Sequence, residues 1–183
     1  MDIAMDLFAK EGYGHVSIAN LASRAGISKG LLYNYFESKD DLLKEILNAG
    51  IEDIMVYFDQ DHDGILTQEE FILFVRKTFQ LMHENKEFWS RFFGIVIQPN
   101  VMPYLKDSAL ASFMEKYFGM FEDYFRRQGF EDPALEVLHL SVIMEGLGIM
   151  LIFYGSLAEL PADLFKKFED RIINTYTKRN EIH

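Results

Sequence analysis

Apolar residues recur every three to four positions along most of this chain, which is the spacing of one face of an α-helix. No convincing stretch alternates apolar and polar residues as a half-buried strand would. The pattern therefore predicts an all-α protein of about nine helices. The expected helices cover residues 3–11, 17–25, 28–36, 38–58, 67–84, 86–97, 103–129, 133–155 and 161–178.

Short polar residues stand where several of these helices should begin. Ser17, Ser28 and Ser38 each precede an apolar-periodic segment, as N-cap residues do. Gly26 lies between two of the segments, where a tight turn needs a residue that can adopt positive φ. The helices that follow these caps predict a small N-terminal domain at residues 1–47 and a larger domain at residues 48–183.

Composition narrows the possible functions. The chain has 183 residues, 49% of them hydrophobic, so it can bury a substantial core. It has no cysteine, which excludes disulfides, thiolate catalysis and zinc-thiolate sites. The net charge of −11 means that any contact with nucleic acid must come from a local patch. The apolar run at 138–157 contains His139 and Glu145, which favours a buried helix over a membrane span.

Residues 7–43 carry a specific pattern, "LFAKEGYGHVSIANLASRAGISKGLLYNYFESKDDLL". The features "SI..LA..AGISKG.LY.YF" and "SK..LL" resemble the helix-turn-helix domain of the TetR family of transcriptional regulators. The resemblance implies that residues 1–47 bind a double-stranded DNA operator. It also implies a cytoplasmic homodimeric repressor whose second domain binds a small-molecule effector. Beyond residue 47 the chain matches that family only in the number and length of its helices.

The expected recognition helix begins at residue 28, where backbone N–H groups and the helix dipole favour a phosphate. By the family pattern, Tyr33 contacts phosphate, Tyr35 contacts a base or phosphate, and Lys39 anchors a phosphate. For both tyrosines the alternative is core packing, and Arg24 is either a phosphate contact or a solvated charge. The predicted DNA contacts are Ser17, Ser28, Lys29, Gly30, Tyr33, Tyr35 and Lys39.

The electrostatics of this domain depart from the family. Residues 1–47 hold five basic and seven acidic side chains, a net charge of −2. The family usually carries a basic segment before its first helix, whereas here the helical pattern begins at once. Either such a segment precedes this sequence, or DNA binding relies on a narrow cationic strip.

Residues 59–70 match the calcium loop of an EF-hand, because oxygen-bearing residues recur at its positions 1, 3, 5, 9 and 12 with a glycine at position 6. Calcium prefers six to eight such oxygens, and the carboxylates would repel one another without a cation. The predicted ligands are Asp59, Asp61, Asp63, Ile65, Thr67 and Glu70, with Ile65 acting through its backbone carbonyl.

The alternative for this loop is a polar turn that ends in a capping box. In that arrangement Thr67 and Glu70 satisfy the free N–H groups at the start of a helix. EF-hands usually pair, and the sequence has no second loop of this kind. If calcium binds, we expect the binding to be weak. We expect the bound ion to fix the tilt of the helix at 38–58.

Aromatic residues in the second domain are predicted either to line the effector pocket or to pack in an ordinary core. Glu145 lies in an apolar helix, where an unpaired charge is costly. The alternatives for it are a cationic ligand, a pair with an arginine and a position facing a helix end, of which we favour the pair. By the resemblance, the last two helices form the dimer face, and Gly146 and Gly148 allow a close approach there. The pocket candidates are Phe88, Trp89, Phe92, Phe93, Phe118, Phe121, Met144 and Glu145.

The leading hypothesis is thus an effector-controlled DNA-binding repressor with possible calcium binding. The alternative is a calcium-binding interaction protein that no longer binds DNA. No nucleophile, phosphate loop or histidine–carboxylate set in the sequence indicates an enzyme, and no segment indicates a membrane partner.

Overall fold

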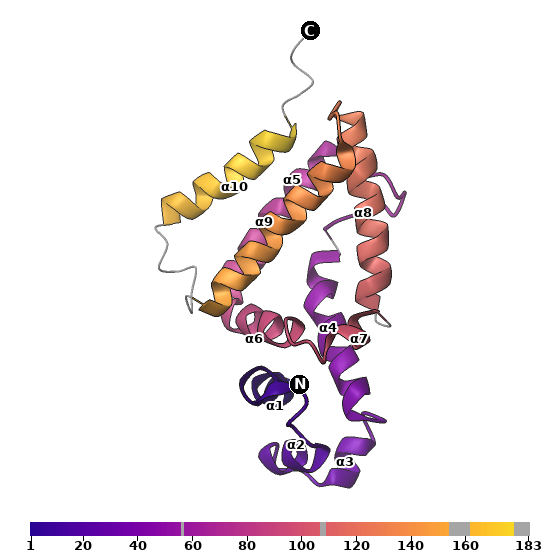
Figure 1. Ribbon diagram of the computed structural model, residues 1–183, viewed down its shortest axis with the longest axis vertical. Helices are drawn as coiled ribbons and strands as arrows, with labels where there is room; N and C mark the ends of the chain where they lie inside the picture. Colours follow the sequence, from indigo (N-terminus) through magenta and orange to yellow (C-terminus); the bar gives the residue numbers. More distant parts are fainter. Residues whose placement is uncertain (56, 107–108, 154–161, 178–183) are drawn as a thin grey trace.

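The computed structural model describes residues 1–55, 57–106, 109–153 and 162–177, and all regular structure within these ranges is helical. This confirms the predicted all-α fold. Figure 1 shows a small head (α1 to α3) at one end of the long axis and a larger body (α5 to α10) at the other, with α4 between them. The α-helices are α1 Asp2–Leu7, α2 Ile18–Arg24, α3 Lys29–Tyr33, α4 Lys39–Met55, α5 Gln68–Glu84, α6 Lys86–Val96, α7 Met102–Lys106, α8 Ala109–Arg127, α9 Pro133–Phe153 and α10 Ala162–Thr177.

The predicted caps of the head are confirmed. The side-chain oxygens of Ser17, Ser28 and Ser38 each accept a hydrogen bond from the backbone N–H three residues later, at 3.0–3.1 Å. Gly26 has a φ of 67°, the left-handed conformation that its turn requires. Local sequence therefore determines where α2, α3 and α4 begin.

Two helix boundaries in the head differ from the prediction. The first helix is not uniform, because α1 ends at Leu7 and continues as a π-helical turn, η1, over Phe8–Gly12. The helix α3 ends at Tyr33, three residues earlier than expected, and Tyr35 lies in the turn that follows it. The backbone N–H of Tyr35 bonds to the carbonyl of Leu32 over 3.1 Å, which tightens the chain as the helix ends.

Three expected boundaries in the body involve residues outside the described ranges. The segment predicted as one helix at 103–129 contains α7 and α8, which lie on either side of residues 107–108. The expected end of the ninth helix, near residue 155, is not among the described residues. The same holds for residues 161 and 178, the expected ends of the last helix.

Aromatic rings fill the centre of the body. Phe58 stacks on Tyr117 and Phe121 of α8, with ring centroids 5.0 and 5.2 Å apart. Phe71 of α5 stacks on Tyr124 of α8 at 5.0 Å. Flat rings at these separations add about 0.5–1.5 kcal/mol per pair beyond the burial of their area. The residue before the acidic loop is thereby held against α8.

The helix α9 is not the buried helix that the sequence suggested. Leu135, Leu138, Val142 and Ile149 are each more than two-fifths exposed on its outer face. Among the described residues, Pro133–Met150 is the one helical stretch long and apolar enough to cross a membrane, and 22% of it is buried. The helix is apolar on nearly all sides, so the sequence pattern does not reveal which face is covered.

Two phenylalanines of α6 rest directly on glycines of neighbouring helices. A Cβ atom added to Gly50 of α4 would lie 2.1 Å from the ring of Phe92. A Cβ atom added to Gly148 of α9 would lie 2.4 Å from the ring of Phe93. These contacts fix the position of α6 between α4 and α9.

The contact between Phe92 and Gly50 gives a test of this packing. We expect Gly50→Ala to lower the free energy of unfolding by about 1–3 kcal/mol, because the new methyl group overlaps the ring. Gly119→Ala in α8 is the matched control, since nothing lies within 4 Å of a Cβ atom there. It should raise stability by up to about 1 kcal/mol through better helix propensity. Urea denaturation of both variants checks this, and equal effects of the two would contradict the packing described.

Candidate nucleic-acid interface

Around α3, buried and exposed side chains lie next to one another in the sequence. Leu32 is buried in the core, whereas the side chain of Tyr33 next to it is 46% exposed. Tyr35, in the turn after α3, is 74% exposed, and Lys29 and Gly30 are also exposed. Nζ of Lys29 lies 5.7 Å from the centre of the Tyr33 ring. We call the exposed residues Lys29, Gly30, Tyr33 and Tyr35 the α3 surface.

Lys39 is placed differently from the other predicted DNA contacts. Its ammonium group donates to the backbone carbonyls of Tyr13 at 2.8 Å and Val16 at 3.0 Å. It also lies 4.2 Å from the centre of the Tyr13 ring. Two of its three donors are therefore used within the protein, where they hold the start of α4 against the first helices of the head.

Most cations of the head are already engaged. Lys10 pairs with Asp6 at 2.7 Å, and Arg24 pairs with Glu11 at 3.3 Å. Arg24 thus forms an exposed ion pair, which the sequence pattern did not predict. Both pairs are largely exposed, and such pairs contribute about 0–1 kcal/mol, so they can exchange partners.

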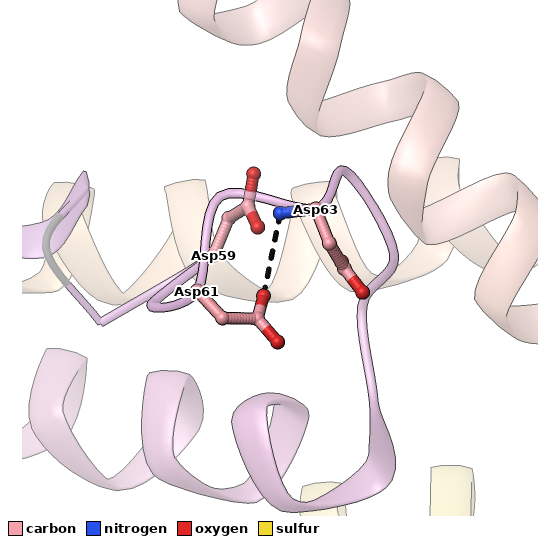
Figure 2. Close-up of side chains that lie close together, drawn as sticks. All are labelled: Asp59, Asp61 and Asp63. Carbon is pink, nitrogen blue, oxygen red and sulfur yellow. Dashed lines mark hydrogen bonds between the residues drawn. The ribbon is translucent and has the colours of Figure 1, made fainter.

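The acidic loop brings together three of its predicted metal ligands. One carboxylate oxygen from each of Asp59, Asp61 and Asp63 lies within 4.8 Å of the others. Figure 2 shows the three side chains and the hydrogen bond from the backbone N–H of Asp63 to Asp61. Gly64 has a φ of 78°, as the sharp bend requires. Ile65 donates its N–H to Asp63 at 2.7 Å.

The end of the loop forms the predicted capping box. Thr67 accepts a hydrogen bond from the N–H of Glu70, and the Glu70 carboxylate accepts from the N–H and hydroxyl of Thr67. The other Glu70 oxygen accepts from the N–H of Gln60 at 3.1 Å. Both oxygens of Glu70 are therefore used inside the loop.

Two cations of α8 dock the loop on the body. Lys116 donates to Asp59 at 2.6 Å, and Arg127 donates to the backbone carbonyl of Leu66 at 2.8 Å. Asp59 is only 4% exposed, so it needs such a partner. The hydrogen bond from Lys116 outweighs burial and lowers the pKa of the Asp59 carboxyl below its usual value. Lys116 thereby supplies part of the positive charge that the loop requires.

The eight predicted pocket residues do not form one lining. Phe88, Trp89, Phe92 and Phe93 make a cluster of rings on α6, with centroids 5.3–6.1 Å apart. Phe121 instead belongs to the rings around Phe58. Met144 is half-buried, whereas Phe118 and Glu145 are exposed. Glu145 is exposed on α9, so its charge does not require a buried partner, and its pair with an arginine stays a prediction.

A family model identifies the head. Residues 1–46 match the model described as bacterial regulatory proteins of the tetR family. The head is a TetR-family helix-turn-helix domain. This confirms the resemblance carried by residues 7–43.

Two curated relatives share part of the chain. A transcriptional repressor of Rhodococcus jostii, KstR2, is 39% identical over 54 residues, which are 30% of this chain and 26% of the relative. The fatty acid metabolism regulator protein of Bacillus subtilis is 25% identical over 83 residues, 45% of this chain and 43% of the relative. The matches thus cover less than half of each relative.

Solved structures extend the similarity to the whole fold. The TetR family transcriptional regulator PfmR from Thermus thermophilus superposes with a TM-score of 0.66 and 21% identity. The superposition covers 94% of this chain and 92% of that protein. The TetR-family head is therefore joined to a body with the fold of such regulators.

No pattern in the sequence indicates the residue that joins the TetR-family head to the body, or those that dock the acidic loop on α8. Gln98 follows α6, and its side chain bonds to the backbone of Phe8 and Tyr13. Lys116 and Arg127 lie in an ordinary amphipathic helix pattern. Their roles depend on partners 57–90 residues away in the chain, which no local spacing indicates.

The pair of Lys116 and Asp59 predicts a dependence of stability on pH. We expect Lys116→Met to lower the free energy of unfolding at pH 7 by about 1–3 kcal/mol, because a buried carboxylate loses its partner. The folded-state pKa of Asp59 is lowered, so the stabilisation is present above the unfolded pKa of about 4 and is lost as pH falls through the folded value. The difference between wild type and variant should therefore shrink in acid.

Denaturant titrations from pH 7 to pH 3 measure this difference. Lys10→Met is the control, since its pair with Asp6 is exposed and should contribute less than about 1 kcal/mol. A pH-independent difference for Lys116→Met would show that the pair does not act in this way.

Proposed function

We propose that this protein is a dimeric transcriptional regulator that binds double-stranded DNA through the α3 surface and represses until a small molecule binds the body. The observation that carries the proposal is the exposure of Lys29, Tyr33 and Tyr35 in a segment that matches the TetR family. Two tyrosines and a lysine that face solvent beside a buried Leu32 can contact phosphates and base edges.

The small number of available cations limits how the α3 surface binds DNA. Lys10, Arg24 and Lys39 are engaged within the head, so Lys29 is the cation that the α3 surface offers directly. We infer that phosphate contacts are few and that hydrogen bonds from Ser17, Ser28 and the tyrosine hydroxyls contribute the remainder. Affinity should then fall less steeply with salt than for a strongly basic protein.

The exposed apolar face of α9 supports the proposed dimer. Leu135, Leu138 and Val142 lie at helical spacing and would bury their side chains against a second copy. A dimer would also present two α3 surfaces related by a two-fold axis. That symmetry is what a regulator needs for an operator with two half-sites.

An apolar effector suits the body. The rings of α6 and the partly buried Met144 offer apolar contacts but few charges. The similar protein of Bacillus subtilis is named for fatty acid metabolism. A fatty acid is therefore the first class of compound to test for release of DNA.

Calcium binding at residues 59–70 remains a second proposal. The convergence of Asp59, Asp61 and Asp63 supports it. Lys116 opposes calcium binding, because its ammonium group already pairs with the carboxylate of Asp59. We infer that an ion would have to displace Lys116 and would bind weakly. If DNA binding failed while calcium bound, the protein would be a calcium-binding interaction protein instead.

DNA binding is tested with a duplex that the wild-type protein selects from a random library. We expect Tyr35→Ala to weaken binding at least about tenfold, since loss of one good contact costs about 1–3 kcal/mol. Lys29→Ala should lower the slope of log affinity against log salt by about 1. Phe118→Ala, an exposed aromatic of α8, is the control and should leave affinity unchanged. Unchanged binding by Tyr35→Ala and Lys29→Ala would exclude the α3 surface.

The dimer is tested by sedimentation equilibrium. We expect Leu138→Glu to shift the protein toward monomer by at least about tenfold in the dissociation constant, because a buried unpaired charge is costly. Phe118→Glu places the same charge on α8 and should leave the assembly unchanged. A wild-type monomer, or equal effects of both variants, would contradict the proposed face.

Calorimetric titration with calcium tests the loop on chelator-treated protein. We expect one weak site per chain, abolished by Asp59→Ala with Glu70→Gln. Lys116→Met should bind calcium more tightly, because Asp59 no longer has to release an ammonium group. Absence of heat at millimolar calcium in both wild type and Lys116→Met would leave the loop as a capped acidic turn.

A further inference from the structure

The side chain of Gln98 bridges the body and the head. Its Oε1 accepts a hydrogen bond from the N–H of Tyr13 at 2.8 Å. Its Nε2 donates to the carbonyl of Phe8 at 2.8 Å and to the carbonyl of Gly94 at 2.9 Å. One amide therefore connects the end of α6 to both ends of the π-helical turn η1.

The π-helical turn makes this bridge necessary. Tyr13 is only 4% exposed, and its N–H bonds to a side chain at the point where the turn ends. An unpaired N–H at a buried position would cost about twice the net contribution of an ordinary hydrogen bond. The conformation of residues 8–13 in the head thus depends on a residue of the body.

Tyr13 is held from two further sides. Its hydroxyl donates to Asp40, and its carbonyl accepts from Lys39, both in the first turn of α4. The ring of Tyr104 in α7 meets its ring edge-on at 5.5 Å. Each polar group of Tyr13 is bound by a different side chain, and α4, α6 and α7 converge on it. We call Gln98, Tyr13, Lys39 and Asp40 the Tyr13 junction.

Phe92 and Phe93, within α6, fix this helix to the body. Phe92 rests on Gly50 of α4, and Phe93 rests on Gly148 of α9. Closely packed helices move as units because their interiors do not deform smoothly. A shift of α6 therefore has to move η1 with it or break the bonds of Gln98.

We propose that Gln98 is the positioning residue through which movement of α6 reaches the head, by way of Tyr13 and η1. This route is separate from a tilt of α4 alone. The inference rests on the proposed DNA binding of the head. Since coupling between two sites is reciprocal, DNA bound at the head must also change the stability of α6.

Hydrogen exchange of the full chain, measured by mass spectrometry with and without the selected duplex, tests the junction. In wild type, DNA should slow exchange of α6 amides by about fivefold or more, as well as those of the head. In Gln98→Leu, DNA should protect the head while α6 stays unchanged. Gln98→Glu keeps the acceptor for Tyr13 and loses the two donated bonds, so its α6 protection should fall between these limits. Gln80→Leu, at an exposed glutamine of α5, should behave as wild type.

Several outcomes would overturn the inference. In one, DNA protects α6 equally in wild type and in Gln98→Leu. In another, DNA does not protect α6 in wild type. Without DNA, Gln98→Leu should already speed exchange at residues 8–13 and leave α8 unchanged. Uniform acceleration throughout the chain would reduce Gln98 to a general stabilising residue. Failure to select any duplex would instead refute the proposed function, and the DNA-free comparison would still test the junction.

Discussion

One hydrophobic core runs from the head into the body, and α4 carries it across. Leu42, Leu43, Ile46 and Leu47 are all at most 2% exposed, and they belong to the same cluster of buried residues as Phe8 and the aromatic rings of α8. The boundary expected near residue 47 therefore falls inside α4, directly after this buried stretch. The head is joined to the body by a helix, so its position depends on what holds α4 and on the bonds of Gln98 to Phe8 and Tyr13.

Separate contacts hold the start of α4 and the residues that follow its end. At the start, Lys39 and Asp40 bind Tyr13, which Gln98 also binds from α6. After the end, Phe58 stacks on α8 and Asp59 pairs with Lys116. A change in the body can reach the head through either end. The acidic loop is part of this arrangement whether or not it binds an ion, since Lys116 already neutralises its buried carboxylate.

Local rules in the sequence predicted much of the fold. Serine caps, the positive φ of Gly26 and the capping box of Thr67 and Glu70 depend on neighbours within four residues, so their pattern is visible in the chain. The helix-turn-helix followed from many matched positions at fixed spacing. The exposed face of α9 could not be predicted, because a helix that is apolar on nearly all sides does not show which side is covered.

Contacts between residues far apart in the sequence account for the other differences between the predicted and the observed structure. The π-helical turn depends on Gln98, which is 85–90 residues away from its partners. The phosphate contact of Lys39 stays a prediction, but its bonds to two backbone carbonyls of the head were not predicted. Phe121 and the rings of α6 were grouped by composition, but they face different helices. In each case the deciding partner is distant in sequence.

The most direct measurement is the sequence of the DNA that the full chain selects from a random library. Two heads held at fixed positions by α4 should enrich a two-fold symmetric sequence. Its half-sites should be centred about 34–36 Å apart along the duplex, or a whole multiple of one helical turn. Enrichment of single half-sites at variable spacing, or of no sequence, would contradict a dimer whose heads are fixed to its bodies.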